Sequence, residues 1–282
     1  MNHTRPAAPS SPRLAQTLCA GGAALGIAVA AASSAFATCA PVAGAPRAWR
    51  AAVVPEGLPK AGSVELTFLG HATFLLRTAG GVTAIMDYTD YVPAPLTPDI
   101  ATMNIAHPTH YSLSPDPGIK HILRGWSEGG APGGVAGHNL TLRDLRVFNV
   151  PTNIREWGTG GTRYAGNSIF VFEAAGLCIA HLSHLHHTLT DEHLKQLGPI
   201  DVALVPIDGL YTLPQLRAVE VVEQIKPKVV IPQHVFTPVA VEQFIAILGD
   251  RWPVRRNETA TAVFSRASLP ERQLLVLNAP YR

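Results

Sequence analysis

The sequence has 282 residues, 47% of them hydrophobic and 15% charged, which is enough for one large domain or two small ones with a sizeable core. Its net charge of +2, without a cluster of Lys and Arg, argues against nucleic acid or an anionic membrane surface as a partner. The three cysteines are too few for a disulfide scaffold.

The first 37 residues predict a secretory signal that is not part of the fold. Residues 1–16 are polar with two arginines and no acidic residue, residues 17–37 are mostly small and apolar, and Ala35-Phe36-Ala37 offers a cleavage site. We therefore expect an exported, periplasmic protein with no membrane span after cleavage. Two alternatives stay open: an uncleaved signal that anchors the chain, since about 20 apolar residues can span a bilayer, and a lipid on Cys39.

Residues 38–62 are rich in Ala, Pro and Gly and predict a linker that leads into a domain over residues 63–282. Short runs rich in β-branched and aromatic residues predict strands in this domain. Gly80-Gly81 and Ala175-Gly176 each separate two such runs and predict hairpins. The predicted strands are residues 64–70, 72–78, 82–88, 100–106, 145–151, 168–174, 177–183, 202–208 and 228–234.

Helices are predicted only in the second half of the domain. Residues 190–198 begin with Thr190, carry two acidic residues in the first turn and end at a glycine, while residues 212–227 and 237–250 have apolar residues at helical spacing. Strands followed by alternating helices and strands indicate an α/β sandwich in which helices cover two packed sheets. The glycine-rich segment 127–137 is a candidate flexible flap.

Histidines come just after several of the predicted strands. They are His107 and His110, His184, His186 and His187, and His234. Imidazoles at the carboxyl ends of strands that are far apart in the sequence allow a fold to gather ligands on one metal ion. This pattern predicts a metal centre.

The motifs around these histidines resemble the metallo-β-lactamase superfamily, and within it the lactonase and phosphodiesterase-like branch that includes L-ascorbate-6-phosphate lactonase-type proteins. The likeness covers roughly residues 63–236 and is carried by LTFLGHATFLLRT, AIMDY, PDIATMNIAHPTH, GNSIFVFEAAGLCIAHLSHL, LGPIDVALVPIDGLYTL and AVEVVEQIKPKVVIPQHV. The resemblance implies the αββα four-layer sandwich of that superfamily. It also implies a metal-dependent hydrolase with a small-molecule substrate.

The first ligand motif of the family is only half present. Where two-metal members carry His-x-His-x-Asp-His, this sequence reads IAHPTH. Ile105 replaces the first histidine and Thr109 replaces the aspartate, while His107 and His110 remain. Isoleucine has no donor atom for a metal, so we expect one of the two metal sites of the family to be lost.

The later ligand positions of the family differ as well. A histidine that follows a Val-Pro pair is Ile154 here, or Asn153 if the alignment shifts by one residue. The bridging aspartate corresponds to His184, and the last histidine corresponds to His234. The resemblance implies one zinc ion on His110, His184 and His234, because three imidazoles and a water form a zinc site that activates the water.

Five neighbouring residues are predicted to support this site. His71 recurs in the same branch and is expected to orient a ligand or a water, and Asp87 is a nearby carboxylate at the end of its strand. Thr109 is a weak ligand or holds a water. His186 is the better alternative ligand on strand geometry, and His187 is the better one on the resemblance.

Two residues are predicted to take part in the reaction itself. His107 is a fourth ligand or a general base beside the metal, and Asp208 supplies acid/base chemistry. We expect an exported hydrolase in which one zinc ion activates water against an ester, a lactone or a phosphodiester. The alternatives are a catalytically inactive binding protein of the same fold and a metal-binding protein that uses the SHLHH segment.

Overall fold

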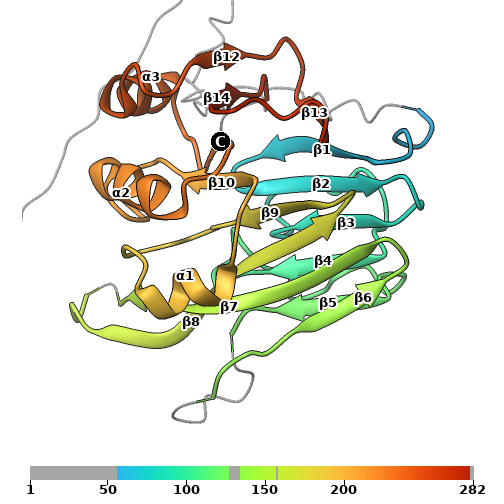
Figure 1. Cartoon of the computed structure of the whole chain (residues 1–282). Helices are drawn as coiled ribbons and strands as arrows, with labels where there is room; N and C mark the ends of the chain where they lie inside the picture. The colour runs from blue at the N-terminus through green and yellow to red at the C-terminus, as the bar shows by residue number, and fades with distance from the viewer. Residues whose placement is uncertain (1–55, 127–133, 157, 280–282) are drawn as a thin grey trace, which may run out of the picture. The chain divides into compact units, whose positions relative to one another are not determined.

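The computed structural model describes residues 56–126, 134–156 and 158–279. The predicted signal, Cys39, most of the predicted linker and most of the predicted flap lie outside the described residues. The described chain forms two β-sheets that face each other and three helices (Figure 1). None of the described helices is long and apolar enough to cross a membrane.

The first sheet has six strands in the order β13, β1, β2, β3, β4 and β5. β1, β2 and β3 form an antiparallel meander, β4 and β5 continue it in parallel, and β13 returns late in the chain to pair with β1. The strands are β1 (Ser63–Gly70), β2 (Thr73–Thr78), β3 (Thr83–Met86), β4 (Ile100–Met103), β5 (His121–Arg124) and β13 (Thr261–Ser265).

The second sheet has eight strands in the order β12, β14, β11, β10, β9, β8, β7 and β6. β6 to β9 pair antiparallel, and β9, β10, β11, β14 and β12 pair in parallel. The strands are β6 (Asn139–Leu142), β7 (Leu145–Arg155), β8 (Thr162–Ala174), β9 (Leu177–His181), β10 (Val202–Pro206), β11 (Val229–Gln233), β12 (Val254–Arg256) and β14 (Gln273–Val276).

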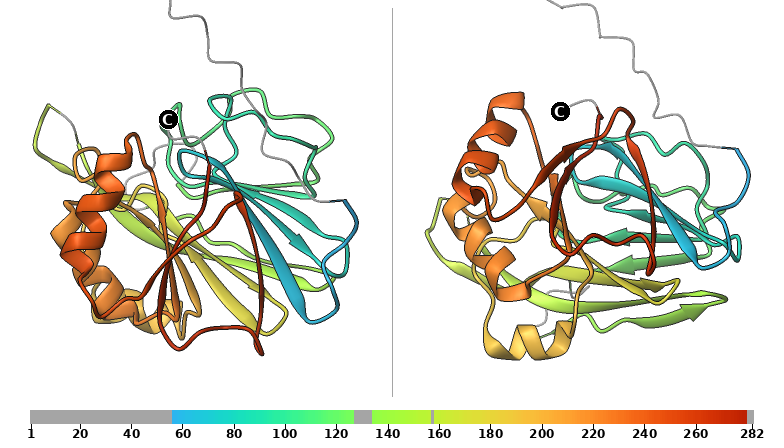
Figure 2. Two further views of the ribbon diagram at one scale, coloured as in Figure 1. Left: turned by 90° about the horizontal axis from the view of Figure 1, so that it is seen from above. Right: turned by 45° about the horizontal axis from the view of Figure 1, so that its top comes forward.

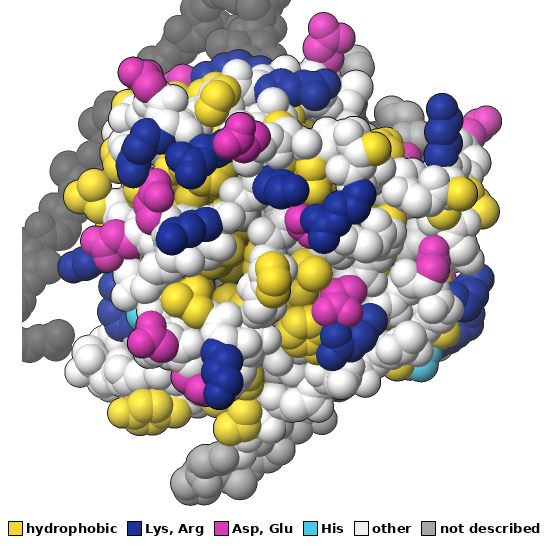
Figure 3. Space-filling model, viewed as in Figure 1, with side chains coloured by type: hydrophobic (Ala, Val, Ile, Leu, Met, Phe, Trp, Pro, Cys, Tyr) yellow, Lys and Arg dark blue, Asp and Glu magenta, His cyan; other side chains and the backbone are white. Residues whose placement is uncertain are grey.

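The helices α1 (Asp191–Leu197), α2 (Gln215–Ile225) and α3 (Pro238–Leu248) all lie on the outer face of the second sheet (Figure 2). Thr190 caps α1 by accepting from the His193 N–H, and Thr237 caps α3 by accepting from the Ala240 N–H. On the face in Figure 3, basic and acidic side chains are interspersed, with no field of a single sign.

The main core lies between the two sheets, where β-branched and aromatic residues of both inner faces meet, among them Phe68, Phe74, Phe170 and Phe172. A second core lies under the helices, and a small third one lies on the outer face of the first sheet. The predicted strands, helices and hairpins are confirmed, and so is the fold class. One layer differs, since in the described chain the outer face of the first sheet is covered by the loop after β3, which includes Val92, and not by a helix.

Candidate metal centre

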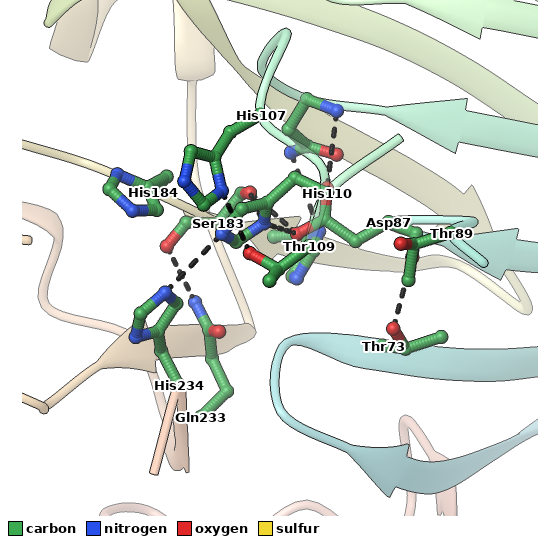
Figure 4. A network of polar contacts seen from close by, with 12 residues as sticks. Thr73, Asp87, Thr89, His107, Thr109, His110, Ser183, His184, Gln233 and His234 are labelled. Carbon is green, nitrogen blue, oxygen red and sulfur yellow. Dashed lines mark hydrogen bonds and ion pairs between the residues drawn. The ribbon is translucent and has the colours of Figure 1, made fainter. Parts of the chain in front are cut away.

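Loops that follow strands of both sheets meet at one edge of the sheets, where Asp87, His110, His184 and His234 lie close together (Figure 4). Asp87 follows β3 and His110 follows β4 in the first sheet. His184, Asp208 and His234 follow the parallel strands β9, β10 and β11 of the second sheet. The carboxyl ends of parallel strands are where α/β folds place their functional sites. The predicted residues are therefore brought together by the topology of both sheets.

The backbone at this edge is held in an unfavourable conformation. Of the eight described non-glycine residues with positive φ, four belong to the site: His71, Asp87, Ser183 and His234. Each such residue costs about 1–3 kcal/mol and persists only where its surroundings hold it. The His234 N–H donates to the His71 carbonyl at 2.6 Å, which ties the β1–β2 turn to the end of β11.

Asp87 is a fully buried carboxylate that is surrounded by donors. Its Oδ2 accepts from the Ser183 hydroxyl at 2.7 Å and lies 2.7 Å from Nδ1 of His110, and its Oδ1 accepts from the Asn104 N–H at 3.1 Å. Burial raises the pKa of Asp87 to about 6, while His181, Ser183 and the Asn104 amide act in the opposite direction. At neutral pH the Asp87 side chain is ionised.

Asp208 is held by the backbone that follows it. Its Oδ2 accepts from the N–H groups of Leu210, Tyr211 and Thr212 at 2.9, 2.5 and 3.2 Å. Its Oδ1 accepts from the Thr212 hydroxyl and lies 3.1 Å from Nδ1 of His234. Burial acts to raise the pKa of Asp208, but His234, Thr212 and the amides outweigh it and hold the pKa below its usual range. A carboxylate so engaged does not fit the predicted acid/base role, and it fixes His234 instead.

His110 and His234 face each other between these two carboxylates. Nε2 of His110 lies 3.3 Å from Nε2 of His234, and both residues are buried. An ionised carboxylate only accepts hydrogen bonds, so Nδ1 of His110 carries the proton. Nδ1 of His234 lies 3.1 Å from the Asp208 carboxylate without an aligned hydrogen bond, and the negative charge favours the same tautomer there. Burial, followed by the charge of His234, lowers the pKa of His110 well below its usual value, so an additional proton on His110 is disfavoured. The two Nε2 lone pairs therefore point at each other.

This donor pair fits a metal ion. Two facing lone pairs repel each other unless a cation lies between them. In a tetrahedral zinc site with Zn–N bonds of about 2.0–2.1 Å, neighbouring ligand nitrogens are about 3.3–3.4 Å apart. The observed separation of 3.3 Å matches this value. A carboxylate behind each imidazole is also the arrangement that fixes the tautomer of metal-binding histidines.

His71 completes a group of three histidines. One ring nitrogen each of His71, His110 and His234 lies within 4.8 Å of the other two. Nδ1 of His71 is buried without a hydrogen-bond partner among the described residues. Burial, followed by the charges of His234 and His110, lowers the pKa of His71, so its ring is neutral. The sequence predicts His71 only as an orienting residue, whereas the fold places it with the ligands.

The histidines after β9 bond to one another and to the backbone. Nδ1 of His184 lies 2.7 Å from Nε2 of His186, and Nδ1 of His186 accepts from the Arg155 N–H at 3.1 Å. Burial, followed by the charge of Arg155, lowers the pKa of His186 to about 4. His187 has both ring nitrogens engaged, one with a backbone N–H at 3.0 Å and one with a backbone carbonyl at 2.7 Å. These bonds leave no open cluster for metal storage in SHLHH, and they make His187 a structural residue.

A cavity of about 550 Å³ opens beside the three-histidine group. Ile105 and Ile154, which the sequence predicts at two ligand positions of the family, line it and are nearly buried. His107 also lines the cavity; its Nδ1 lies 3.0 Å from the Thr109 hydroxyl, and its ring centroid is 5.9 Å from that of His110. The other residues around the cavity are His71, Ala106, Thr109, Arg155, Glu156, Arg163, His184, His186, Tyr211, His234 and Phe236.

Solved structures share this architecture. A putative zinc-dependent hydrolase of the metallo-β-lactamase superfamily from Thermotoga maritima is 27% identical, with a TM-score of 0.56 over 77% of this chain and 100% of its own. Igni18, described as a metallo hydrolase from Ignicoccus hospitalis, has a TM-score of 0.51 at 19% identity over 72% of this chain and 99% of its own, which shows the fold alone. The fold is that of the metallo-β-lactamase proteins.

Residues 65–234 match the family model of the Beta-lactamase superfamily domain, and the chain belongs to this family. A UPF0173 metal-dependent hydrolase of Methanoculleus marisnigri is 26% identical over 193 residues, which is 64% of this chain and 84% of the relative. One of Thermococcus onnurineus is 34% identical over 115 residues, 38% of this chain and 50% of the relative, so that match spans half the length of the relative. The superfamily predicted from the sequence is confirmed.

Proposed function

We propose that this protein is a hydrolase with one zinc ion, held by His110 and His234 with His71 as the third protein ligand. The observation that carries the proposal is the 3.3 Å separation of two buried Nε2 atoms whose partner nitrogens both face carboxylates. The relatives named as metal-dependent hydrolases support the same activity. When bound there, zinc would polarise a substrate oxygen and lower the pKa of a water molecule.

The protein residues around the ion have separate tasks in this proposal. Asp87 and Asp208 keep the ligand rings in the tautomer that leaves Nε2 free. His107 is the general base, because it is exposed at the cavity while its Nδ1 is engaged by Thr109. Burial, followed by the charge of His234, lowers the pKa of His107, so a neutral ring accepts the proton of the attacking water.

A single ion and the apolar part of the cavity lining favour a carbonyl substrate, although Arg155, Glu156 and Arg163 also line the cavity. Phosphodiester hydrolysis often uses two ions that hold both the attacking and the leaving oxygen. Ile105 and Ile154, the predicted replacements of ligands of a second ion, line the cavity, and Tyr211 and Phe236 continue the apolar lining. We therefore place an ester or a lactone with an apolar group ahead of a phosphodiester.

Metal analysis combined with hydrolysis assays tests this function. The purified protein is expected to hold about one zinc per chain and to cleave p-nitrophenyl butyrate or a γ-lactone with a short alkyl chain. Removal of the metal with a chelator is expected to abolish the hydrolysis, and added zinc is expected to restore it. Hydrolysis that persists without bound metal would overturn the proposal.

The loss of two family ligands to Ile105 and Ile154 favours one alternative, an inactive protein that retains the fold and binds a ligand. The same experiment separates the two functions. Zinc at one equivalent without turnover of any ester or lactone, together with binding of the uncleaved compounds, would favour the inactive protein.

We also propose that the protein is exported to the periplasm. The support is the layout of residues 1–37, a polar basic start followed by small apolar residues and a small-x-small end. Mass spectrometry of the protein from a periplasmic fraction is expected to find a new amino terminus after Ala37. An intact chain in the membrane fraction, or a lipid on Cys39, would overturn cleavage at that position.

A further inference from the structure

A chain of hydrogen bonds leads from the backbone to His184. It begins at the N–H of Arg155, which donates to Nδ1 of His186 at 3.1 Å. It continues from Nε2 of His186 to Nδ1 of His184 over 2.7 Å. A backbone N–H can only donate, so the first bond fixes the direction of the second.

The direction of this chain determines where each ring carries its proton. Nδ1 of His186 accepts, so the neutral His186 ring has its proton on Nε2 and donates it to His184. Nδ1 of His184 therefore accepts, and the proton of the neutral His184 ring lies on Nε2. The opposite order would place an Nδ1–H of His186 against the Arg155 N–H, two donors facing each other.

His184 thus has an N–H, and no lone pair, to offer at the cavity. Its Nε2 makes no hydrogen bond to any described residue, and the side chain lines the cavity. Its ring centroid lies 4.7 Å from that of His110 and 5.0 Å from that of His234, with the rings nearly perpendicular. A metal ligand needs a lone pair, so this geometry conflicts with the predicted ligand role of His184.

We propose that His184 is a hydrogen-bond donor to the substrate oxygen beside the metal group, and that His186 is a positioning residue that keeps His184 in the donor tautomer. The inference rests on the proposed hydrolase function. In ester hydrolysis the oxygen of water bonds to the carbonyl carbon, the ester C–O bond breaks, and the alcohol leaves with a proton from the water. Negative charge builds up on the carbonyl oxygen between these events, and a fixed N–H stabilises it without giving up its proton.

The tautomers can be observed directly in metal-free protein labelled with ¹⁵N-histidine. Long-range ¹H–¹⁵N spectra are expected to show His184 and His186 as neutral rings with the proton on Nε2. His186→Leu is expected to release His184 into a mixture of tautomers, while the matched change His187→Leu leaves His184 unchanged. A wild-type His184 ring with its proton on Nδ1 would overturn the inference, whether or not the variants fold.

Metal content and kinetics test the catalytic role of His184. His184→Ala is expected to retain about one zinc and to lower kcat for p-nitrophenyl butyrate by a factor on the order of 10²–10³, with little change in KM. His184→Gln, which restores an N–H donor, is expected to recover part of the loss. Loss of zinc from His184→Ala, or unchanged kcat, would overturn the role. If the wild type neither binds zinc nor hydrolyses esters, the proposed function fails and the catalytic role with it, whereas the tautomer result stands by itself.

Discussion

The two sides of the cavity differ in what they offer to a metal ion. On one side His71, His110 and His234 gather three imidazoles, and two of these rings have a carboxylate behind them. On the other side Ile105 and Ile154 present only methyl and methylene groups. In the proposed function, one side holds the cation and the other contacts an apolar group of the substrate.

This difference raises the question of how far the two sides are supported independently. The bonds that fix the histidines lead to Asp87 after β3, Ser183 after β9 and Asp208 after β10. The isoleucines lie after β4 and in β7. Ile105 shares the loop after β4 with His110 and directly follows Asn104, whose N–H donates to Asp87, whereas β7 contributes none of these supporting residues. Two isoleucines on one side therefore coexist with the three histidines of the proposed metal site and their two carboxylates on the other. The following changes test whether the two sides are as separate as this arrangement indicates.

The largest effect is expected from removing a ligand on the histidine side. His234→Ala takes away one of the two facing Nε2 atoms and the imidazole that faces Asp208. We expect the zinc to be lost and hydrolysis to fall to background. Metal analysis by mass spectrometry after gel filtration measures the first effect, and p-nitrophenyl butyrate assays measure the second.

Ile154→Ala is the matched control on the opposite side. It widens the apolar wall and is expected to keep one zinc per chain while changing KM for esters of different chain length. If Ile154→Ala loses the metal as His234→Ala does, the two sides are not independent.

A smaller effect is expected from the carboxylate behind His234. Asp208→Asn keeps one side-chain oxygen that can accept from the backbone N–H groups of residues 210–212. It removes the negative charge that faces Nδ1 of His234. Loss of such a supporting partner typically weakens metal binding about 10–100-fold. Competition with a fluorescent zinc chelator measures the affinity. The matched change Asp116→Asn alters a carboxylate outside the cavity lining that accepts from the Thr97 hydroxyl and the Gly118 N–H, and should leave the affinity as it is. Equal affinities for both variants would speak against the role of Asp208.

Adding two histidines on the isoleucine side is expected to raise the number of bound zinc ions per chain by one. Ile105→His combined with Ile154→His would place two imidazoles beside His107, which already lines the cavity. We expect up to two zinc ions per chain, the second bound more weakly than the first. The control pair Ile105→Leu and Ile154→Leu should stay at one. A double histidine variant that also stays at one would mean that the backbone of this side, and not only its side chains, no longer fits an ion.

The sequence predicts the secondary structure and the fold better than the contacts within the site. The long β-branched runs and the three helices could be recognised because burial and helix caps impose strong local patterns. The strands that are not predicted from the sequence are β5, β6, β12, β13 and β14. In β12, for example, all three residues are exposed and have no alternating pattern. His110 and His234 follow strands within recognisable motifs, whereas the place of His71 depends on a bond to His234 across the two sheets. The engagement of Asp208 by three amides likewise exists only after the loop has folded.

The smallest effect concerns the packing that supports the apolar side. Gly125, after β5, lies against the backbone that leads to Ile105: a Cβ there would come within 2.6 Å of the Asn104 carbonyl oxygen and 2.8 Å of the Ser168 Cβ. Gly125→Ala is therefore expected to destabilise the fold by about 1–3 kcal/mol, the usual cost of overpacking. Urea denaturation measures this loss, and Gly137→Ala is the control, because a Cβ at Gly137 meets nothing within 4 Å. If the sides are independent, zinc affinity in the folded Gly125→Ala variant stays at the wild-type value although stability falls. A parallel fall in both would show that the metal group depends on the packing beneath Ile105.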